Sequence, residues 1–149
     1  MTRAYIDTSA LAKWYVPEAG SEAFATYMLQ EADEAVTSGL TAVELRCVLA
    51  RKRRAGLVTT EFEQEAYARF VRQVGDGEML LLPWEGTMFM AARELIDRLA
   101  GIALRTLDAL HLAAAQAVGA RELATADRVM GDAAQALGLQ LRYFGAPGG

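Results

Sequence analysis

The sequence has little of the residues from which many enzyme sites are built. It contains one cysteine, Cys47, and one histidine, His111, among its 149 residues. A disulfide within the chain is therefore impossible, and zinc sites made of several thiolates or imidazoles are excluded. A Ser-His-Asp triad would have to use His111. The absence of disulfides favours a reducing compartment.

Long apolar runs and a strong net charge are also missing. No segment approaches the ~18 consecutive apolar residues that span a bilayer, and the N-terminus lacks the apolar core of a secretion signal. We therefore expect a cytoplasmic protein with no membrane partner. The formal net charge of −4 argues against long-range attraction to nucleic acid, so any RNA contact must be local.

The 149 residues, of which 53% are hydrophobic, are enough for one domain that buries its own core. Patterns typical of strands and helices alternate along the whole chain. The predicted strands are 4–6, 34–38, 79–82, 122–125 and 139–144. The predicted helices are 8–15, 21–32, 40–54, 60–74, 87–99, 107–118 and 127–137, and residues 145–149 are expected to form a disordered tail. This order predicts a three-layer, Rossmann-like α/β fold with a central, mainly parallel sheet flanked by helices.

Several side chains are expected to belong to the core. The unbroken apolar strand 79–82 predicts a strand covered on both faces. We expect Cys47 to be a small buried side chain and His111 to be a packed, hydrogen-bonded core residue. The same expectation holds for the large residues of the first two helices, Trp14, Tyr15, Phe24, Tyr27 and Met28.

Four acidic residues stand where this class of fold forms its sites. Asp7 and Asp127 each follow a predicted strand, so both carboxylates should emerge at the same edge of a parallel sheet. Asp108 lies in the first turn of a predicted helix, and Glu44 interrupts an apolar helical stretch. Taken singly, Asp108 could simply be a residue that favours the start of a helix, and Glu44 could simply lie on a solvated helix face. In one pocket the four would repel by on the order of 10–20 kcal/mol, which predicts protonation or a bound hard cation, Mg²⁺ or Mn²⁺.

The segments around these acids resemble a known family. They are Tyr-Ile-Asp-Thr-Ser-Ala-Leu at 5–11, Thr-Ala-Val-Glu-Leu at 41–45, Leu-Asp-Ala-Leu-His-Leu-Ala at 107–113 and Ala-Thr-Ala-Asp at 124–127. Together they look like the four successive acidic motifs of PIN domains, and most of all like those of VapC-type toxins. The resemblance covers essentially the whole chain, and the ordered set is specific although each motif alone is weak.

The resemblance implies a metal-dependent endoribonuclease, the toxin of a bacterial or archaeal toxin–antitoxin pair. It implies that Asp7, Glu44, Asp108 and Asp127 are the catalytic residues and hold Mg²⁺ or Mn²⁺. We expect Asp7 and Asp127 to be direct ligands, and Glu44 and Asp108 to complete the site. The implied partners are RNA, a VapB-like antitoxin that occupies a groove formed in part by the early helices, and a second copy of the chain in a homodimer.

Polar residues beside the acids are candidates for supporting roles. Thr8 and Ser9 either cap the first helix or bond to Asp7 or to substrate. Thr125 is either a plain strand residue or, two positions before Asp127, a neighbour of a metal-bound water. Arg51, two turns after Glu44, belongs either to a solvated helix end or to an RNA phosphate contact.

Other functions remain open at this point. A PIN-type nuclease could act in RNA processing outside a toxin–antitoxin pair, and a non-catalytic module could bind RNA or protein while its acids only cap helices. Cation binding and the effect of a chelator separate these alternatives. A haloacid-dehalogenase-like phosphatase with Asp7 as nucleophile needs a second aspartate two residues later, where Ser9 stands.

Overall fold

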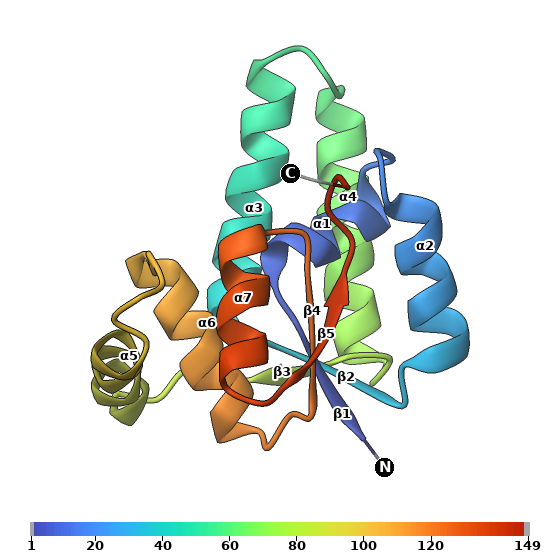
Figure 1. Ribbon diagram of the computed structural model, residues 1–149. Coiled ribbons are helices and arrows are strands. Elements are labelled where there is room, and N and C mark those ends of the chain that lie inside the picture. Colours follow the sequence, from blue (N-terminus) through green and yellow to red (C-terminus); the bar gives the residue numbers. More distant parts are fainter. Residues whose placement is uncertain (1, 148–149) are drawn as a thin grey trace.

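A five-stranded sheet forms the centre of the computed structural model, which describes residues 2–147 (Figure 1). Its strands are β1 (Arg3–Ile6), β2 (Glu34–Ser38), β3 (Leu80–Leu82), β4 (Glu122–Thr125) and β5 (Gln140–Tyr143). The order across the sheet is β3-β2-β1-β4-β5, and every neighbouring pair is parallel. The predicted α/β class with a central parallel sheet is therefore confirmed.

Helices connect the strands and cover both faces of the sheet. They are α1 (Thr8–Tyr15), α2 (Ser21–Thr26), α3 (Gly39–Arg54), α4 (Thr60–Gly75), α5 (Thr87–Arg98), α6 (Thr106–Ala117) and α7 (Arg128–Ala136). The predicted helix 21–32 is divided, because α2 ends at Thr26 and a π-helical turn, η1 (Tyr27–Glu31), continues it. None of the described helices has the length and hydropathy that a membrane crossing requires.

The central strand β1 connects the two halves of the core. Ala4 and Ile6 pack with the cluster formed by α1, α2, α3 and α4, whereas Tyr5 packs with the cluster formed by α5, α6 and α7. This division follows from the period of two along a strand, which sends successive side chains to opposite faces. All three side chains are at most 1% exposed, so β1 is covered on both faces as the layered fold requires.

Two predictions of burial are wrong. Leu80 and Leu81 of β3 are 43% and 36% exposed, because β3 lies at the edge of the sheet with β2 as its one strand neighbour. Cys47 is exposed as well. The buried residues of α3 are Thr41, Leu45 and Leu49, spaced four apart, and Cys47 lies outside that stripe.

The expected disordered tail lies partly outside the described residues, which end at 147. Residues 145–147 follow β5 without helix or strand structure. The last paired strand residue is Tyr143, whose hydroxyl donates a hydrogen bond to the backbone oxygen of Ala146.

We expect replacement of a buried leucine of α6 to destabilise the fold strongly. Leu112→Ala removes a side chain that is 0% exposed and should lower the free energy of unfolding by about 2–5 kcal/mol. Leu107→Ala, on the same helix but 46% exposed, should cost about 1 kcal/mol or less. Urea denaturation measures both, and equal losses would contradict the assignment of α6 to the core.

Candidate functional site

The connections of the sheet create a place where a site can form. From β1 the chain runs outward to β2 and β3, and it then returns to β4 on the other side of β1. The connection after β1 and the connection after β4 therefore run in opposite directions. Such a place is a topological switch point, where α/β sheets form a crevice that can bind a ligand. Asp7 directly follows β1, and Asp127 lies two residues after the end of β4.

Asp7 is buried at this point and holds the start of α1. Its Oδ1 accepts hydrogen bonds from Ser9 Oγ (2.7 Å) and from the backbone N–H of Ala10 (3.0 Å), and its Oδ2 accepts one from Thr125 Oγ1 (2.5 Å). Asp7 itself thus caps α1, so a cap by Thr8 or Ser9 is wrong, whereas the alternative prediction of a hydrogen bond to Asp7 is confirmed for Ser9. Burial raises the pKa of Asp7, although His111 and the three hydrogen bonds act in the opposite direction.

Thr125 connects Asp7 to Asp127. Its Oγ1 donates to Asp7 and accepts a hydrogen bond from the backbone N–H of Asp127 (3.0 Å). The Oδ1 of Asp127 accepts from the N–H groups of Val129 (2.9 Å) and Met130 (3.4 Å), so this carboxylate caps α7. Thr125 therefore contacts both acids, and a contact of its hydroxyl with a metal-bound water stays a prediction.

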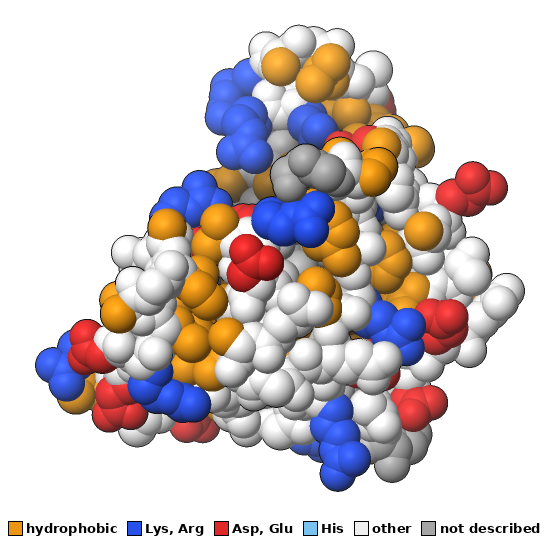
Figure 2. Space-filling view, in the orientation of Figure 1, with side chains coloured by type: hydrophobic (Ala, Val, Ile, Leu, Met, Phe, Trp, Pro, Cys, Tyr) orange, Lys and Arg blue, Asp and Glu red, His pale blue; other side chains and the backbone are white. Residues whose placement is uncertain are grey.

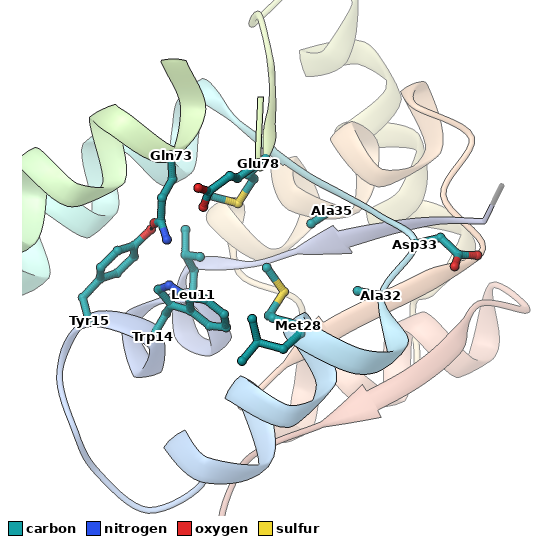
Figure 3. A pocket seen from close by; sticks show the side chains of 11 residues that line it. Leu11, Trp14, Tyr15, Met28, Ala32, Asp33, Ala35, Gln73 and Glu78 are labelled. Carbon is teal, nitrogen blue, oxygen red and sulfur yellow. Dashed lines mark hydrogen bonds between the residues drawn. The ribbon is translucent and has the colours of Figure 1, made fainter. Parts of the chain in front are cut away.

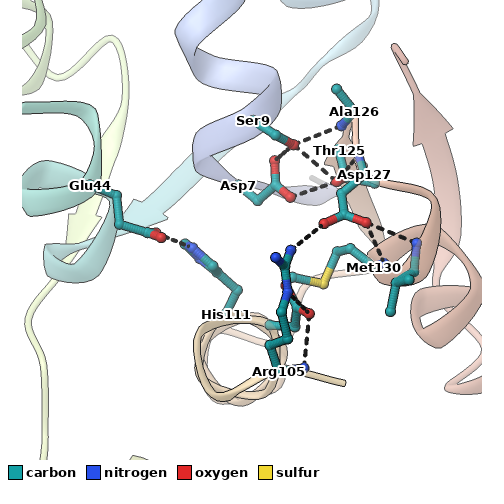
Figure 4. Close-up of polar contacts among 11 residues, drawn as sticks. Asp7, Ser9, Glu44, Arg105, His111, Thr125, Ala126, Asp127 and Met130 are labelled. Atoms are coloured by element: carbon teal, nitrogen blue, oxygen red, sulfur yellow. Dashed lines mark hydrogen bonds and ion pairs between the residues drawn. The ribbon is translucent and has the colours of Figure 1, made fainter. Parts of the chain in front are cut away.

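Arg105, which the sequence analysis did not single out, joins Asp108 to Asp127 (Figure 4). Its backbone N–H donates to Asp108 Oδ2 at 3.0 Å, and its side-chain Nε lies 3.5 Å from the same oxygen. Its Nη2 lies 3.2 Å from Asp127 Oδ2. The one available signal in the sequence was a basic residue three positions before an acid at a predicted helix start.

Glu44 lies in a separate group with His111. His111 Nε2 lies 2.5 Å from Glu44 Oε1 and donates to it, because a carboxylate is only an acceptor. Thr8 Oγ1 donates to the same oxygen at 2.8 Å. Partial burial acts to raise the pKa of Glu44, but the hydrogen bond and charge of His111, with the Thr8 hydroxyl, outweigh it and lower the pKa.

The expected core position of His111 is confirmed, since its side chain is 5% exposed and hydrogen-bonded at both ring nitrogens. Its Nδ1 lies 2.8 Å from the Tyr5 hydroxyl, which lies 2.9 Å from Ser38 Oγ. What the sequence did not reveal is that this buried chain ends on Glu44. His111 is thus a core residue that also contacts one of the four candidate acids.

The four carboxylates are not crowded in the way that their positions in the sequence predict. Among residues 2–147, no three His, Cys, Asp or Glu side chains are close enough to hold a metal ion together. The donor set nevertheless fits a hard cation, because all four candidates offer carboxylate oxygens, the ligands that Mg²⁺ and Mn²⁺ prefer. A positive group, the Arg105 guanidinium, already lies between two of them.

A groove lined by apolar side chains together with Asp33, Gln73 and Glu78 lies on another side of α1 (Figure 3). Its volume is about 420 Å³, and its lining includes Leu11 and Trp14 of α1 and Met28 and Leu29 of η1. We call it the α1–η1 groove. Leu29 is 76% exposed, and Trp14 Nε1 is buried without a hydrogen-bond partner among the described residues.

The expected core role holds for three of the five large residues of the first two helices. Tyr15, Phe24 and Tyr27 are buried, whereas Trp14 and Met28 are only partly buried. The two exceptions line the α1–η1 groove.

Lys and Arg side chains gather on one face, near the ends of α3, α6 and α7 that lie toward the top of the view (Figure 2). Arg51 is exposed in the last turn of α3. Arg46 and Arg53 of the same helix are bound to the buried Glu63, at 2.8 and 2.6 Å. The basic end of α3 therefore contains both structural and solvent-exposed cations.

We expect the stability difference between Asp7→Asn and the wild type to change with pH. Because burial raises the pKa of Asp7 above 3.8, the folded state binds more protons than the unfolded state between 3.8 and the raised value. Wild-type stability therefore falls as the pH rises through that window, and the uncharged variant escapes this loss. Urea denaturation in EDTA should show the difference growing in favour of the variant as the pH rises above about 4.

The exposed Asp132→Asn on α7 is the matched control, and its difference from the wild type should not vary in this way. A pH-independent difference for Asp7→Asn would contradict the raised pKa.

Comparisons with known proteins agree with this architecture. The family model for the PIN domain matches residues 4–136. VapC20 of Mycobacterium tuberculosis, a sarcin–ricin loop cleaving toxin, is 18% identical with a TM-score of 0.69, and the match covers 91% of this chain and 95% of that one. No curated protein matches the chain in sequence.

Two further solved structures have the same fold. VapBC2 from Rickettsia felis, bound to a DNA fragment from its promoter, is 14% identical with a TM-score of 0.67, covering 96% of this chain and 99% of that one. FitAcB from Neisseria gonorrhoeae is 15% identical with a TM-score of 0.58, covering 93% and 95%. The family match spans most of the chain, and the chain therefore belongs to the PIN domain family.

Proposed function

We propose that this protein is an endoribonuclease that uses Mg²⁺ or Mn²⁺ to hydrolyse RNA phosphodiester bonds, and the toxin of a VapBC-like toxin–antitoxin pair. Membership of the PIN family supports nuclease activity, and the similar fold of a toxin that cleaves the sarcin–ricin loop supports RNA as substrate. The observation that carries the proposal is the position of Asp7 and Asp127 at the switch point between β1 and β4, where Thr125 links them and Arg105 pairs with both Asp127 and Asp108.

Asp7 and Asp127 are the proposed direct ligands of the cation. Glu44 and Asp108 complete the site, directly or through water, and one of them orients the attacking water. When bound, a divalent cation neutralises charge on the phosphate oxygens and activates a water molecule without a histidine base.

The surrounding residues prepare these carboxylates. Ser9, Ala10 and Thr125 fix the orientation of the Asp7 carboxylate, and the positive charge of a bound cation favours its ionised form against the effect of burial. The N–H groups at the start of α7 occupy Oδ1 of Asp127, so Oδ2 is the oxygen directed at the site. Thr8 and His111 hold Glu44 in the same way through Oε1.

We expect single substitutions of the acids to abolish cleavage. Asp7→Asn and Asp127→Asn should each lower the rate of RNA cleavage by more than about 100-fold, because they remove ligands rather than the residues that orient them. Total RNA incubated with the purified protein and Mn²⁺ or Mg²⁺ measures the rate by gel electrophoresis. EDTA should stop cleavage, and excess Mn²⁺ should restore it.

The control is Asp76→Asn, which replaces an exposed acid at the C-terminal end of α4 and should keep the wild-type rate. Cleavage that continues in EDTA, or full activity of Asp7→Asn, would contradict the metal-dependent mechanism. Cation and RNA binding with no cleavage would favour the non-catalytic binding module. Cleavage by a protein whose gene has no antitoxin neighbour would favour RNA processing outside a toxin–antitoxin pair.

We also propose a VapB-like antitoxin as partner, with the α1–η1 groove as part of its binding surface. Solved structures with this fold include VapBC2 and FitAcB, and the groove offers exposed apolar surface beside the early helices. Exposed apolar patches with a polar rim mark sites of protein–protein interaction. A second copy of the chain is another proposed partner, supported by the exposed apolar side chains Phe89, Met90 and Ile96 on α5.

We expect Leu29→Glu to weaken binding of the antitoxin encoded beside this gene by about tenfold, because it places a charge in an apolar contact. Isothermal titration with the purified partner measures the affinity. Leu57→Glu, which changes an equally exposed leucine beyond the end of α3, should bind as the wild type does. Equal affinities for Leu29→Glu and the wild type would exclude the groove from the interface.

A further inference from the structure

Arg105 joins acidic side chains that come from two different elements. Its Nη2 lies 3.2 Å from Oδ2 of Asp127, which follows β4, and its Nε lies 3.5 Å from Oδ2 of Asp108 on α6. Figure 4 shows the guanidinium directed toward the carboxylate of Asp127. A single positive group therefore compensates two of the four acids of the site.

The structure does not need this side chain in order to form. The Arg105 side chain is 77% exposed, and exposed ion pairs contribute little to stability. The contact at the start of α6 uses the backbone N–H of Arg105, which any non-proline residue provides. By contrast, the side chain of Glu63 is 4% exposed and is held by Arg46 and Arg53, so loss of both arginines would leave a buried carboxylate without a partner. The Arg105 guanidinium can leave its position without damage to the fold.

A divalent cation competes with Arg105 for the same oxygen. Oδ1 of Asp127 already accepts hydrogen bonds from Val129 and Met130, so Oδ2 is left for either positive group. A displaced guanidinium stays tethered beside the acids by its own backbone. Its planar fork of N–H donors then suits a phosphate group, which accepts such bonds in pairs.

We propose that Arg105 has two successive partners: it neutralises Asp108 and Asp127 while no divalent cation is bound, and it binds a phosphate of the RNA once the cation takes its place. This inference rests on the proposed function, since it requires that these acids bind a cation and that the substrate is a nucleic acid. It makes Arg105 a substrate-binding residue that also sets the affinity of the site for metal.

The proposal predicts opposite effects of one substitution on two ligands. Arg105→Gln should bind Mn²⁺ about two- to fivefold more tightly than the wild type in the absence of RNA, because an exposed competing ion pair has been removed. The same variant, with Mn²⁺ present, should bind a labelled phosphorothioate RNA oligonucleotide less tightly. The slope of log affinity against log salt should become shallower by about 0.7, the value for one lost phosphate contact on a single strand. Electron paramagnetic resonance during a Mn²⁺ titration measures the Mn²⁺ affinity, and fluorescence anisotropy of the labelled oligonucleotide measures the RNA affinity.

Two variants control the experiment. Arg72→Gln on α4 removes an exposed arginine of a simple pair with Glu65 and should leave both the Mn²⁺ affinity and the salt slope unchanged. Arg105→Lys keeps one positive charge and should restore the salt slope. One outcome is that the wild type takes up Mn²⁺ while Arg105→Gln has the same Mn²⁺ affinity, or the same salt slope of RNA binding, as Arg72→Gln. In that case the role of Arg105 is overturned and the proposed function stands. If the wild-type protein takes up no Mn²⁺, both are overturned.

Discussion

Burial of the Asp7 carboxylate at the end of the central strand is the constraint on which the site depends. A buried charge without hydrogen bonds would cost several kcal/mol, and Asp7 is 3% exposed. Two of its donors, Ser9 and Ala10, are local, but the third, Thr125, is 118 residues away in the sequence. Thr125 reaches Asp7 only because β4 pairs in parallel with β1. The pairing that completes the sheet therefore also satisfies this charge.

The remaining acids are stabilised by separate partners rather than by one shared ion. Arg105 lies between Asp108 and Asp127, and His111 donates to Glu44. Distributing the charges in this way removes much of the repulsion that four carboxylates in one pocket would suffer. It also lowers the electrostatic cost of holding the four acids in place without a cation.

Much of this arrangement follows from the sequence, and the limits are physical. The patterns of apolar and turn residues predict all five strands and all seven α-helices, although not the π-helical turn η1, and the position of Asp7 and Asp127 after strands predicts that they share a sheet edge. The sequence does not predict that Arg105 pairs with Asp108 and Asp127, or that His111 contacts Glu44. Each of these contacts joins two elements of the fold, and the distance between such elements depends on how they pack. The exposure of strand 80–82 is missed for a similar reason, since a run of leucines does not reveal which strand lies at the edge.

Helix α6 then fixes the distance between the two parts of the site. Asp108 and His111 lie three residues apart on one face of this helix, and one faces Arg105 while the other bonds to Glu44. Residues 108–115 are all buried, so α6 cannot rotate without breaking contacts along its length. The spacing of Glu44 from the other acids is consequently set by a packed helix rather than by loops, which is the kind of support that catalytic geometry needs. A core of alanine and leucine around His111 is therefore part of the site, because it holds the helix that carries both contacts.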